Sequence, residues 1–240
     1  MTVAVIIPTY NESENVEPLA HALLDLGRID HVIVVDDNSP DGTGEIADRL
    51  AAEDGRIVVV HRPAKEGLGR AYLAGYQRAI ELDSSVIMTM DADFSHPPRF
   101  IPAMLDLLEE GYDIVIGSRY VPGGGTHNWG IERQFLSAGA NNFARLVLGL
   151  HAHDCTAGFR AYRRVVIETV PLDTILSNGY SFLVEMLYRC QRLGFRVGEV
   201  PIIFEDRERG QSKINQNEIV KAMLTVFRLT FDRLGAKFGR

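Results

Sequence analysis

Short runs of apolar, mostly β-branched residues recur along the first half of the chain, and this recurrence restricts the possible folds more than any other feature. The runs cover residues 3–7, 31–35, 57–60, 86–90 and 113–117. Stretches with apolar residues at helical spacing separate them. Regular alternation of strands and helices predicts an α/β fold, with a mostly parallel, Rossmann-like central sheet flanked by helices.

The length of the chain predicts one such domain with a carboxyl-terminal extension. The 240 residues suffice for a single substantial core. We expect the α/β domain to cover residues 1–214 and an amphipathic helix to lie within residues 215–240. The apolar residues of 217–234 surround more of the helix than one stripe and have cations beside them, so this helix either contacts a membrane or partner or packs on the domain's own core.

Charge and composition narrow the classes of partner and compartment. The net charge of -7 argues against nucleic acid as a partner. No secretory signal follows Met1, and no apolar run is long enough to cross a bilayer, so we expect a cytoplasmic protein whose membrane contact is peripheral. Cys155 and Cys190 lack metal-type spacing and are expected to be reduced structural thiols.

Polar residues follow three of the expected strands at the point where each strand ends. Asp91 and Asp93 stand one residue apart after the run 86–90, Tyr10 and Glu12 follow the first run, and Asp37 follows the second. The carboxyl ends of parallel strands meet at one edge of a sheet, where α/β proteins bind ligands. Two neighbouring carboxylates can share one Mg²⁺ or Mn²⁺ that bridges to a diphosphate. The pattern favours a nucleotide site; the alternative is that these acids are solvated strand caps.

Two glycine-bearing segments interrupt the regular pattern. Residues 65–71 predict a turn into a helix whose backbone could approach a ligand, although neither a Walker lysine nor a dinucleotide fingerprint follows. Residues 121–130 contain four glycines and are expected to be an irregular binding loop or lid. The absence of a glycine fingerprint after the first strand also excludes a typical dehydrogenase.

Five linked motifs resemble those of GT-A glycosyltransferases of family 2. They are PTYNE at 8–12, VDDNSPDGT at 35–43, DAD at 91–93, GSRY at 117–120, and DR at 206–207 with GQSK at 210–213. Within that family the resemblance is greatest to the dolichol-phosphate (polyprenol-phosphate) mannose synthases, and it extends from about residue 3 to residue 225. It implies transfer of mannose from GDP-mannose to a polyprenyl or dolichyl monophosphate, with inversion.

The resemblance also implies roles for individual residues. The guanosine would be held by Pro8, Tyr10, Glu12, Val35 and Asp37, and the diphosphate and metal by Asp91, the backbone of Ala92, and Asp93, with Ser95 as a further ligand of short reach. Asp93 and Arg119 would be catalytic; Arg119, Arg133 and Ser137 would receive the lipid phosphate, and Arg207 and Lys213, together with Arg119, would contact the donor.

The basic residues also fit this chemistry on independent grounds. A phosphate monoester is largely dianionic at neutral pH and needs screening from the donor diphosphate rather than a general base. Two alternatives remain open: the same fold with UDP-glucose or another nucleotide sugar as donor, and a non-catalytic module that binds a nucleotide sugar. A processive polysaccharide synthase is disfavoured because the second half lacks a Gln-x-x-Arg-Trp signature.

Overall fold

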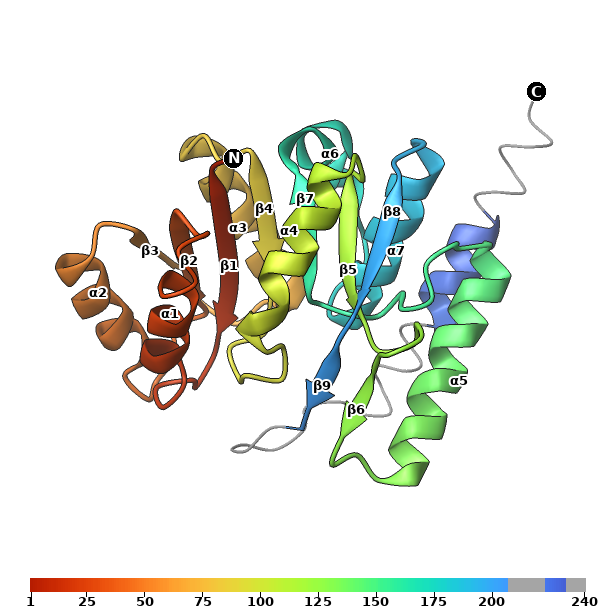
Figure 1. The fold of residues 1–240 in the computed structure, drawn as a ribbon, viewed down its shortest axis with the longest axis horizontal. Helices are drawn as coiled ribbons and strands as arrows, with labels where there is room; N and C mark the ends of the chain where they lie inside the picture. Colours follow the sequence, from red (N-terminus) through yellow and green to blue (C-terminus); the bar gives the residue numbers. More distant parts are fainter. Residues whose placement is uncertain (207–222, 232–240) are drawn as a thin grey trace.

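A seven-stranded sheet forms the centre of the molecule in the computed structural model, which describes residues 1–206 and 223–231. The strand order is β3-β2-β1-β4-β7-β5-β8, and β7 alone runs antiparallel to its neighbours within this sheet. The strands are β1 (Val3–Thr9), β2 (His31–Asp36), β3 (Ile57–His61), β4 (Val86–Thr89), β5 (Ile114–Ser118), β7 (Arg160–Arg163) and β8 (Val197–Pro201). The predicted mostly parallel sheet is confirmed (Figure 1).

Helices cover both faces of this sheet, as the sequence predicts. One core lies under α1 (Val16–Leu24), α2 (Thr43–Glu53) and α4 (Ile101–Glu109), which follows a 3₁₀ turn at Pro98–Phe100. The other lies under α3 (Leu68–Glu81), α6 (Arg164–Thr169), α7 (Tyr180–Arg192) and the end of α5 (Ile131–Leu148), with a further 3₁₀ turn at Leu172–Thr174.

The central strand β1 shows why nearly continuous apolar runs were needed. Val3, Val5 and Ile7 point into the core beneath α1 and α4, whereas Ala4 and Ile6 point into the core beneath α3 and α7. A parallel strand with helices on both sides buries both sets of side chains. Alternating polar residues would therefore have left a polar group in one of the two cores.

A second, two-stranded sheet lies beyond the carboxyl edge of the main one (Figure 1). Its strands are β6 (Gly125–His127) and β9 (Ile203–Glu205), which run parallel. The expectation that residues 121–130 form no regular structure is thus wrong for β6. The apolar residues of 199–204 predict one late strand, at a sheet edge because Pro201 has no N–H for the ladder, but the structure divides this stretch into β8 and β9. The division occurs at Ile202, whose amide donates to Ser118 O at 3.0 Å while its carbonyl accepts from Gly125 N at 3.0 Å. Pro201 lies on the edge strand β8, as predicted.

Residues 223–231 are helical and pack their inner side on the domain. Val226 and Leu229 are buried in the core beneath α3 and α7. Glu185 of α7 is buried and forms ion pairs with Arg189 at 2.7 Å and with Arg228 from the helical segment. The outer side keeps large apolar residues exposed, namely Met223, Leu224, Phe227 and Phe231. The remainder of the helix expected at 217–234 lies outside the described residues.

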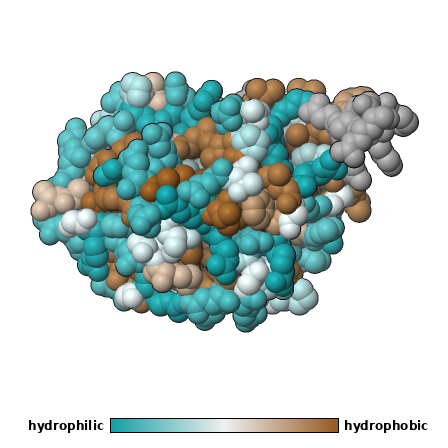
Figure 2. Space-filling model, turned by 90° about the horizontal axis from the view of Figure 1, so that it is seen from above, coloured by the Kyte–Doolittle hydropathy of each residue, from teal (hydrophilic) through white to brown (hydrophobic). Residues whose placement is uncertain are grey.

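Figure 2 shows the surface at the amino-terminal end of the strands from above, where hydrophilic residues are interspersed with hydrophobic areas. Within the described ranges, no helix is both long and apolar enough to pass through a bilayer. The features that the sequence singles out lie at the opposite end of the sheet.

Candidate active site

Three neighbouring parallel strands, β2, β1 and β4, end side by side at the lower edge of the sheet in Figure 1. Backbone hydrogen bonds continue just past their ends: Asp37 N donates to Thr9 O at 3.1 Å, and Met90 N donates to Ile6 O at 3.2 Å. This edge therefore brings together the segments that carry Tyr10, Glu12, Asp37, Asp91 and Asp93, as the sequence predicts.

The Asp37 side of this edge has an acidic, a basic and an aromatic group within one wall. Asp37 is buried and forms an ion pair with Arg62 Nη1, while Arg62 Nη2 lies 2.7 Å from Glu66 Oε2. Burial raises the pKa of the Asp37 carboxyl, and the Arg62 guanidinium partly opposes that rise. Lys65 Nζ lies 4.0 Å from the centre of the Tyr10 ring. A nucleobase is recognised by groups of these kinds, a ring face together with a donor and an acceptor.

The other residues expected at the guanosine lie along the same edge. Pro8 and Val35 face each other in the β1–β2 register, and Val35 is buried. Glu12 Oε2 accepts a hydrogen bond from Asn15 Nδ2 at 2.9 Å at the start of α1. Ala92 is buried, so its backbone rather than its side chain is what it can offer to a ligand.

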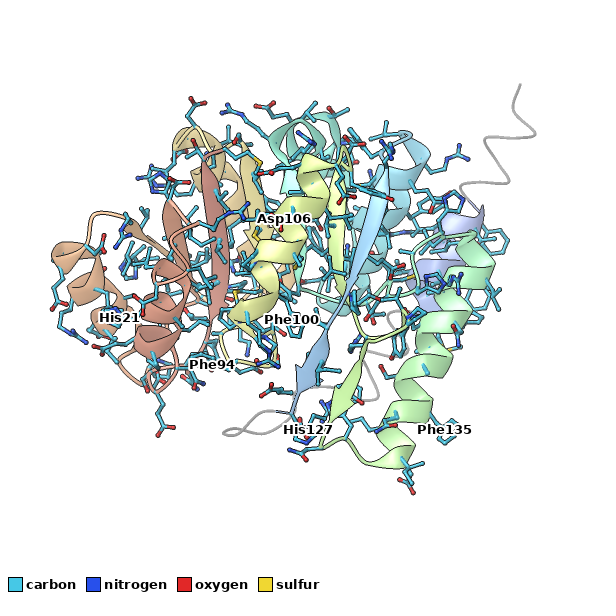
Figure 3. The ribbon with its side chains drawn as sticks, viewed as in Figure 1. His21, Phe94, Phe100, Asp106, His127 and Phe135 are labelled. Atoms are coloured by element: carbon cyan, nitrogen blue, oxygen red, sulfur yellow. The ribbon has the colours of Figure 1, made fainter. Side chains whose placement is uncertain are left out.

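The segment from Asp91 to His96 forms a compact loop held by its own side chains. Asp91 N donates to His96 Nδ1 at 3.0 Å, and Ser95 N donates to Asp93 Oδ1 at 3.1 Å. Phe94 adopts a left-handed backbone conformation with φ of 60°. Figure 3 shows Phe94 beneath the carboxyl edge of the sheet. These two hydrogen bonds hold the loop in a conformation that a non-glycine residue adopts at a cost.

The donor set of this loop fits a hard divalent cation. Asp91 keeps a quarter of its side chain exposed, and the Ser95 hydroxyl is buried without a hydrogen-bond partner among the described residues. Carboxylate and hydroxyl oxygens are the ligands that Mg²⁺ and Mn²⁺ prefer. No group of three or more His, Cys, Asp or Glu side chains within residues 1–206 and 223–231 could hold a metal, so a cation bound by these two carboxylates and the hydroxyl would take its remaining ligands from substrate phosphate and water.

An adjacent cavity of about 400 Å³ reaches this loop. Its lining comprises Glu14, Asn15, Pro18, Asp93, Phe94, Pro97, Pro98, Arg99 and Glu205. The cavity thus extends from the start of α1 past Asp93 to β9, along the carboxyl edge.

His96 connects the acid pair to a second group of charges. Its ring is buried, and this burial lowers the pKa of the imidazole. The charges of Asp91, Asp93, Arg119 and Asp154 all act on that pKa, the aspartates raising it and the arginine lowering it. The Phe204 ring joins these two groups. It meets the His96 ring edge-on with 5.4 Å between ring centres, and the Arg119 guanidinium lies 5.5 Å from its centre, so the loop 91–96 and Arg119 border one site.

Arg119 follows β5 and is held by a buried carboxylate. Its Nε and Nη2 lie 2.7 Å and 2.8 Å from the two oxygens of Asp154, and Nη2 also donates to Thr156 Oγ1 at 2.9 Å. Burial raises the pKa of the Asp154 carboxyl, but the Arg119 guanidinium, the Arg119 backbone amide and the charge of Arg160 together outweigh it, and the pKa is lowered. The guanidinium also lies 5.7 Å from the centre of the Trp129 ring. Arg119 is therefore fixed in direction.

A cavity of about 470 Å³ opens in front of Arg119. It is lined by Arg119, Tyr120, Gly125, Thr126, Trp129, Gln134, Phe135 and Ala138. Of the three residues expected to receive a lipid phosphate, only Arg119 is in the lining itself.

The other two expected phosphate ligands contact the lining residues of this cavity. Ser137 Oγ lies 2.8 Å from the Tyr120 hydroxyl. The Arg133 guanidinium lies 4.1 Å from the centre of the Trp129 ring, and its Nη1 lies 3.0 Å from Asp206 Oδ1. Arg207 and Lys213 lie outside the described residues.

The glycine-bearing turn before α3 has a packing role in the structure. A Cβ on Gly67 or Gly69 would collide with Asn178 or Phe182, respectively. Asn178 Oδ1 accepts a hydrogen bond from Gly69 N at 3.3 Å. The side chains that approach these two glycines closely belong to the chain itself, so packing within the domain explains why glycine is needed there.

The sheet, its flanking helices and the polar carboxyl edge define a GT-A-like α/β fold. Glucosyl-3-phosphoglycerate synthase of Mycobacterium tuberculosis, solved with Mn²⁺, UDP and glucosyl-3-phosphoglycerate, superposes with a TM-score of 0.68. The superposition covers 95% of this chain and 80% of that one at 20% sequence identity, so the likeness concerns the fold.

A comparison with family models identifies the family. The model of glycosyl transferase family 2 matches residues 4–170, and the chain belongs to this family of glycosyltransferases. A polyprenol monophosphomannose synthase of Mycolicibacterium smegmatis is 48% identical over 229 residues, covering 92% of this chain and 84% of that protein. An undecaprenyl-phosphate mannosyltransferase of Micrococcus luteus is 46% identical over 228 residues, covering 95% and 93%.

Proposed function

We propose that this glycosyltransferase transfers mannose from GDP-mannose to the phosphate of a polyprenyl or dolichyl monophosphate, with inversion at the anomeric carbon. The observation that carries the proposal is that His96, which holds the Asp91–Asp93 loop, and Arg119, which lines a cavity, both contact the Phe204 ring. The names of the two relatives support the mannosyl donor sugar and the lipid phosphate acceptor.

In this proposal the guanosine lies against the wall formed by Tyr10 and Asp37. The Asp37 carboxylate accepts hydrogen bonds from the base, and Arg62 keeps that carboxylate oriented. Pro8, Glu12 and Val35 complete the edge on which the nucleoside rests. Arg207 and Lys213 remain predicted contacts of the donor diphosphate.

Asp91, Asp93 and Ser95 would hold Mg²⁺ or Mn²⁺. When bound, the cation neutralises the charge that develops on the departing nucleoside diphosphate. Asp91 and Asp93 supply the carboxylate oxygens, and the buried Ser95 hydroxyl is available as a further oxygen ligand. The backbone of Ala92 faces the diphosphate.

The acceptor phosphate would enter the cavity in front of Arg119. It attacks as a dianion, so the site needs positive charge and direction rather than a strong base. Arg119 supplies a guanidinium fixed by Asp154. Arg133, which now pairs with the half-exposed Asp206, supplies a second charge by turning towards the cavity, and Ser137 supplies a hydroxyl donor.

The lipid chain would leave this cavity along an exposed apolar surface at the cytoplasmic face of a membrane. Phe135 lines the cavity, is 76% exposed and points away from the sheet in Figure 3. Other large exposed apolar side chains on α5 and the helical segment 223–231 are Ile131, Leu136, Leu146, Leu224, Phe227 and Phe231. We propose that the segment 215–240 extends this surface beyond the catalytic domain of residues 1–214, against the bilayer itself or a membrane protein.

A transfer assay tests the function. Purified protein is incubated with Mn²⁺ or Mg²⁺ and with radiolabelled GDP-mannose or UDP-glucose, each with and without a short polyprenyl phosphate. Label should pass into the organic phase only with GDP-mannose, lipid phosphate and metal together. Transfer from UDP-glucose instead would replace the donor, and nucleotide binding without turnover would leave only a binding module.

A matched pair of variants locates the chemistry. Asp93→Asn removes one carboxylate charge from the proposed metal site and should reduce transfer by at least about 100-fold, a loss typical of an electrostatic catalytic group. Asp106→Asn makes the same chemical change on α4, where the side chain is 60% exposed and lies away from the carboxyl edge in Figure 3, and should leave transfer unchanged. Equal activity of the two variants would refute the proposed site.

A further inference from the structure

His96 is a buried, polar residue next to the proposed metal site, and neither the sequence motifs nor the proposed function gives it a task. Only 2% of its surface is exposed. Its Nδ1 accepts the hydrogen bond from Asp91 N at 3.0 Å. The same nitrogen lies 3.9 Å from Asp91 Oδ2, which is beyond hydrogen-bonding distance. The imidazole thus holds Asp91 through its backbone amide rather than through its carboxylate.

The direction of this hydrogen bond fixes the state of the ring. A backbone N–H only donates, so Nδ1 must carry a lone pair, and the neutral ring then has its proton on Nε2. An imidazole in this tautomer is a fixed acceptor facing the first residue of the acid pair.

Packing leaves the ring little freedom to turn. It stacks on Phe159 with 5.2 Å between ring centres and meets Phe204 edge-on at 5.4 Å. Gly158 closes a further side, because a Cβ there would lie 3.7 Å from His96 Cε1 and 3.2 Å from the Tyr72 hydroxyl. The acceptor atom is therefore held in place by Phe159, which precedes β7, and by Phe204 of β9. Both residues lie outside the loop that His96 constrains.

The loop needs such a constraint. Its backbone turns through the left-handed Phe94, and a second side-chain hydrogen bond within it joins Ser95 N to Asp93 Oδ1 at 3.1 Å. Without an acceptor at residue 96, the Asp91 amide would lose its hydrogen bond in a largely buried place, and the turn would relax to recover one. The spacing between the two carboxylates would then no longer be fixed.

We infer that His96 is a positioning residue: its Nδ1 holds the Asp91 backbone so that Asp91 and Asp93 present their oxygens together to the divalent cation of the sugar-nucleotide donor. The inference rests on the metal site of the proposed function. It assigns the imidazole no contact with the cation or the substrate.

Two substitutions of similar size distinguish the effect of the hydrogen-bond acceptor at residue 96 from the effect of the packed ring. His96→Asn places an amide oxygen at the position of Nδ1, bonded to the same carbon, whereas His96→Leu places a methyl group there. Both lose the stacking on Phe159. Binding of Mn²⁺ in the presence of GDP, followed by electron paramagnetic resonance, should be about tenfold weaker in His96→Leu than in His96→Asn, and GDP affinity without metal should agree within about twofold. Equal Mn²⁺ affinities of the two variants would overturn the inference.

A second measurement needs no variant. Long-range ¹H–¹⁵N spectra of the wild-type histidine rings should show His96 as the neutral tautomer with its proton on Nε2, whether or not Mn²⁺ is present. A proton on Nδ1 would refute the inference even if His96→Leu does not fold. If only the proposed function is wrong, the result is different: the wild-type protein binds Mn²⁺ with GDP but transfers no mannose, and the positioning role of His96 still holds.

Discussion

Replacing Asp154 by asparagine should destabilise the protein strongly, because it removes the partner of a guanidinium that is itself nearly buried. The Asp154 side chain is 0% exposed and that of Arg119 is 9% exposed. Asp154 accepts from Arg119 N, Nε and Nη2 and from the amides of Thr156 and Ala157. Removing one member of a buried ion pair costs about 3–5 kcal/mol. The amide keeps some of these hydrogen bonds, so we expect about 3 kcal/mol, or a Tm lowered by about 6–12 °C for a chain of this size.

Urea unfolding of the wild type, Asp154→Asn and the surface control Asp106→Asn measures this loss. The control should stay within about 0.5 kcal/mol of the wild type. In the double variant Arg119→Met with Asp154→Leu both charges are absent, so it should lose less than the sum of the two single changes. A loss below about 1 kcal/mol in Asp154→Asn, or strict additivity in the double variant, would refute the argument that the two charges stabilise each other.

The same pair predicts a dependence of stability on pH. The pKa of Asp154 is lowered from 3.8 in the folded protein. A carboxyl with a lowered folded-state pKa contributes stability that is fully present above its unfolded pKa and is lost as the pH falls through the folded pKa. The free energy of unfolding should therefore fall below about pH 4 in the wild type and fall less steeply in Asp154→Asn. Parallel curves for the two proteins would contradict this.

Two further outcomes follow from buried groups. Burial raises the pKa of the Cys155 and Cys190 thiols to about 12 each, so a thiol reagent at pH 8 should label them only as the protein unfolds, and rapid labelling of the native protein would contradict this. Gly75→Ala should lower the free energy of unfolding in urea by about 1–3 kcal/mol, because its Cβ would overlap an Ile6 methyl group. Gly139→Ala, whose Cβ would meet nothing within 4 Å, should not destabilise the protein. Equal stabilities of the two variants would refute the packing argument.

The parallel part of the sheet was predictable because its strands are nearly continuous apolar runs that need burial on both faces. The antiparallel direction of β7 was not. The segment before Arg160–Arg163 includes the long helix α5, and a connection of that length permits either strand direction. The pairing of β6 with β9 was also missed, because three residues that include a glycine have little strand propensity until their distant partner is present.

The acidic part of the site followed from one rule, that polar residues after parallel strands share an edge. The same rule applied to the third strand would have found Arg62, which directly follows β3. Asp154 gave no such signal, since it follows no strand and its burial depends on tertiary packing against Arg119. The phosphate-binding role of Arg119 stays a prediction, and the sequence did not indicate that two of its side-chain nitrogens face a buried carboxylate.

The small β6–β9 sheet has a consequence for how the chain matures on the ribosome. The β1–β2–β3 and β1–β4 pairings draw on the first ninety or so residues and can assemble while the rest is still being translated. Residues 125–127, in contrast, must wait until residues 203–205 emerge before they gain a partner. The half of the molecule that surrounds Arg119 is thus completed last, and a ribosome stalled between these two segments would display the strand ends that carry Asp37, Asp91 and Asp93 without the β6–β9 sheet.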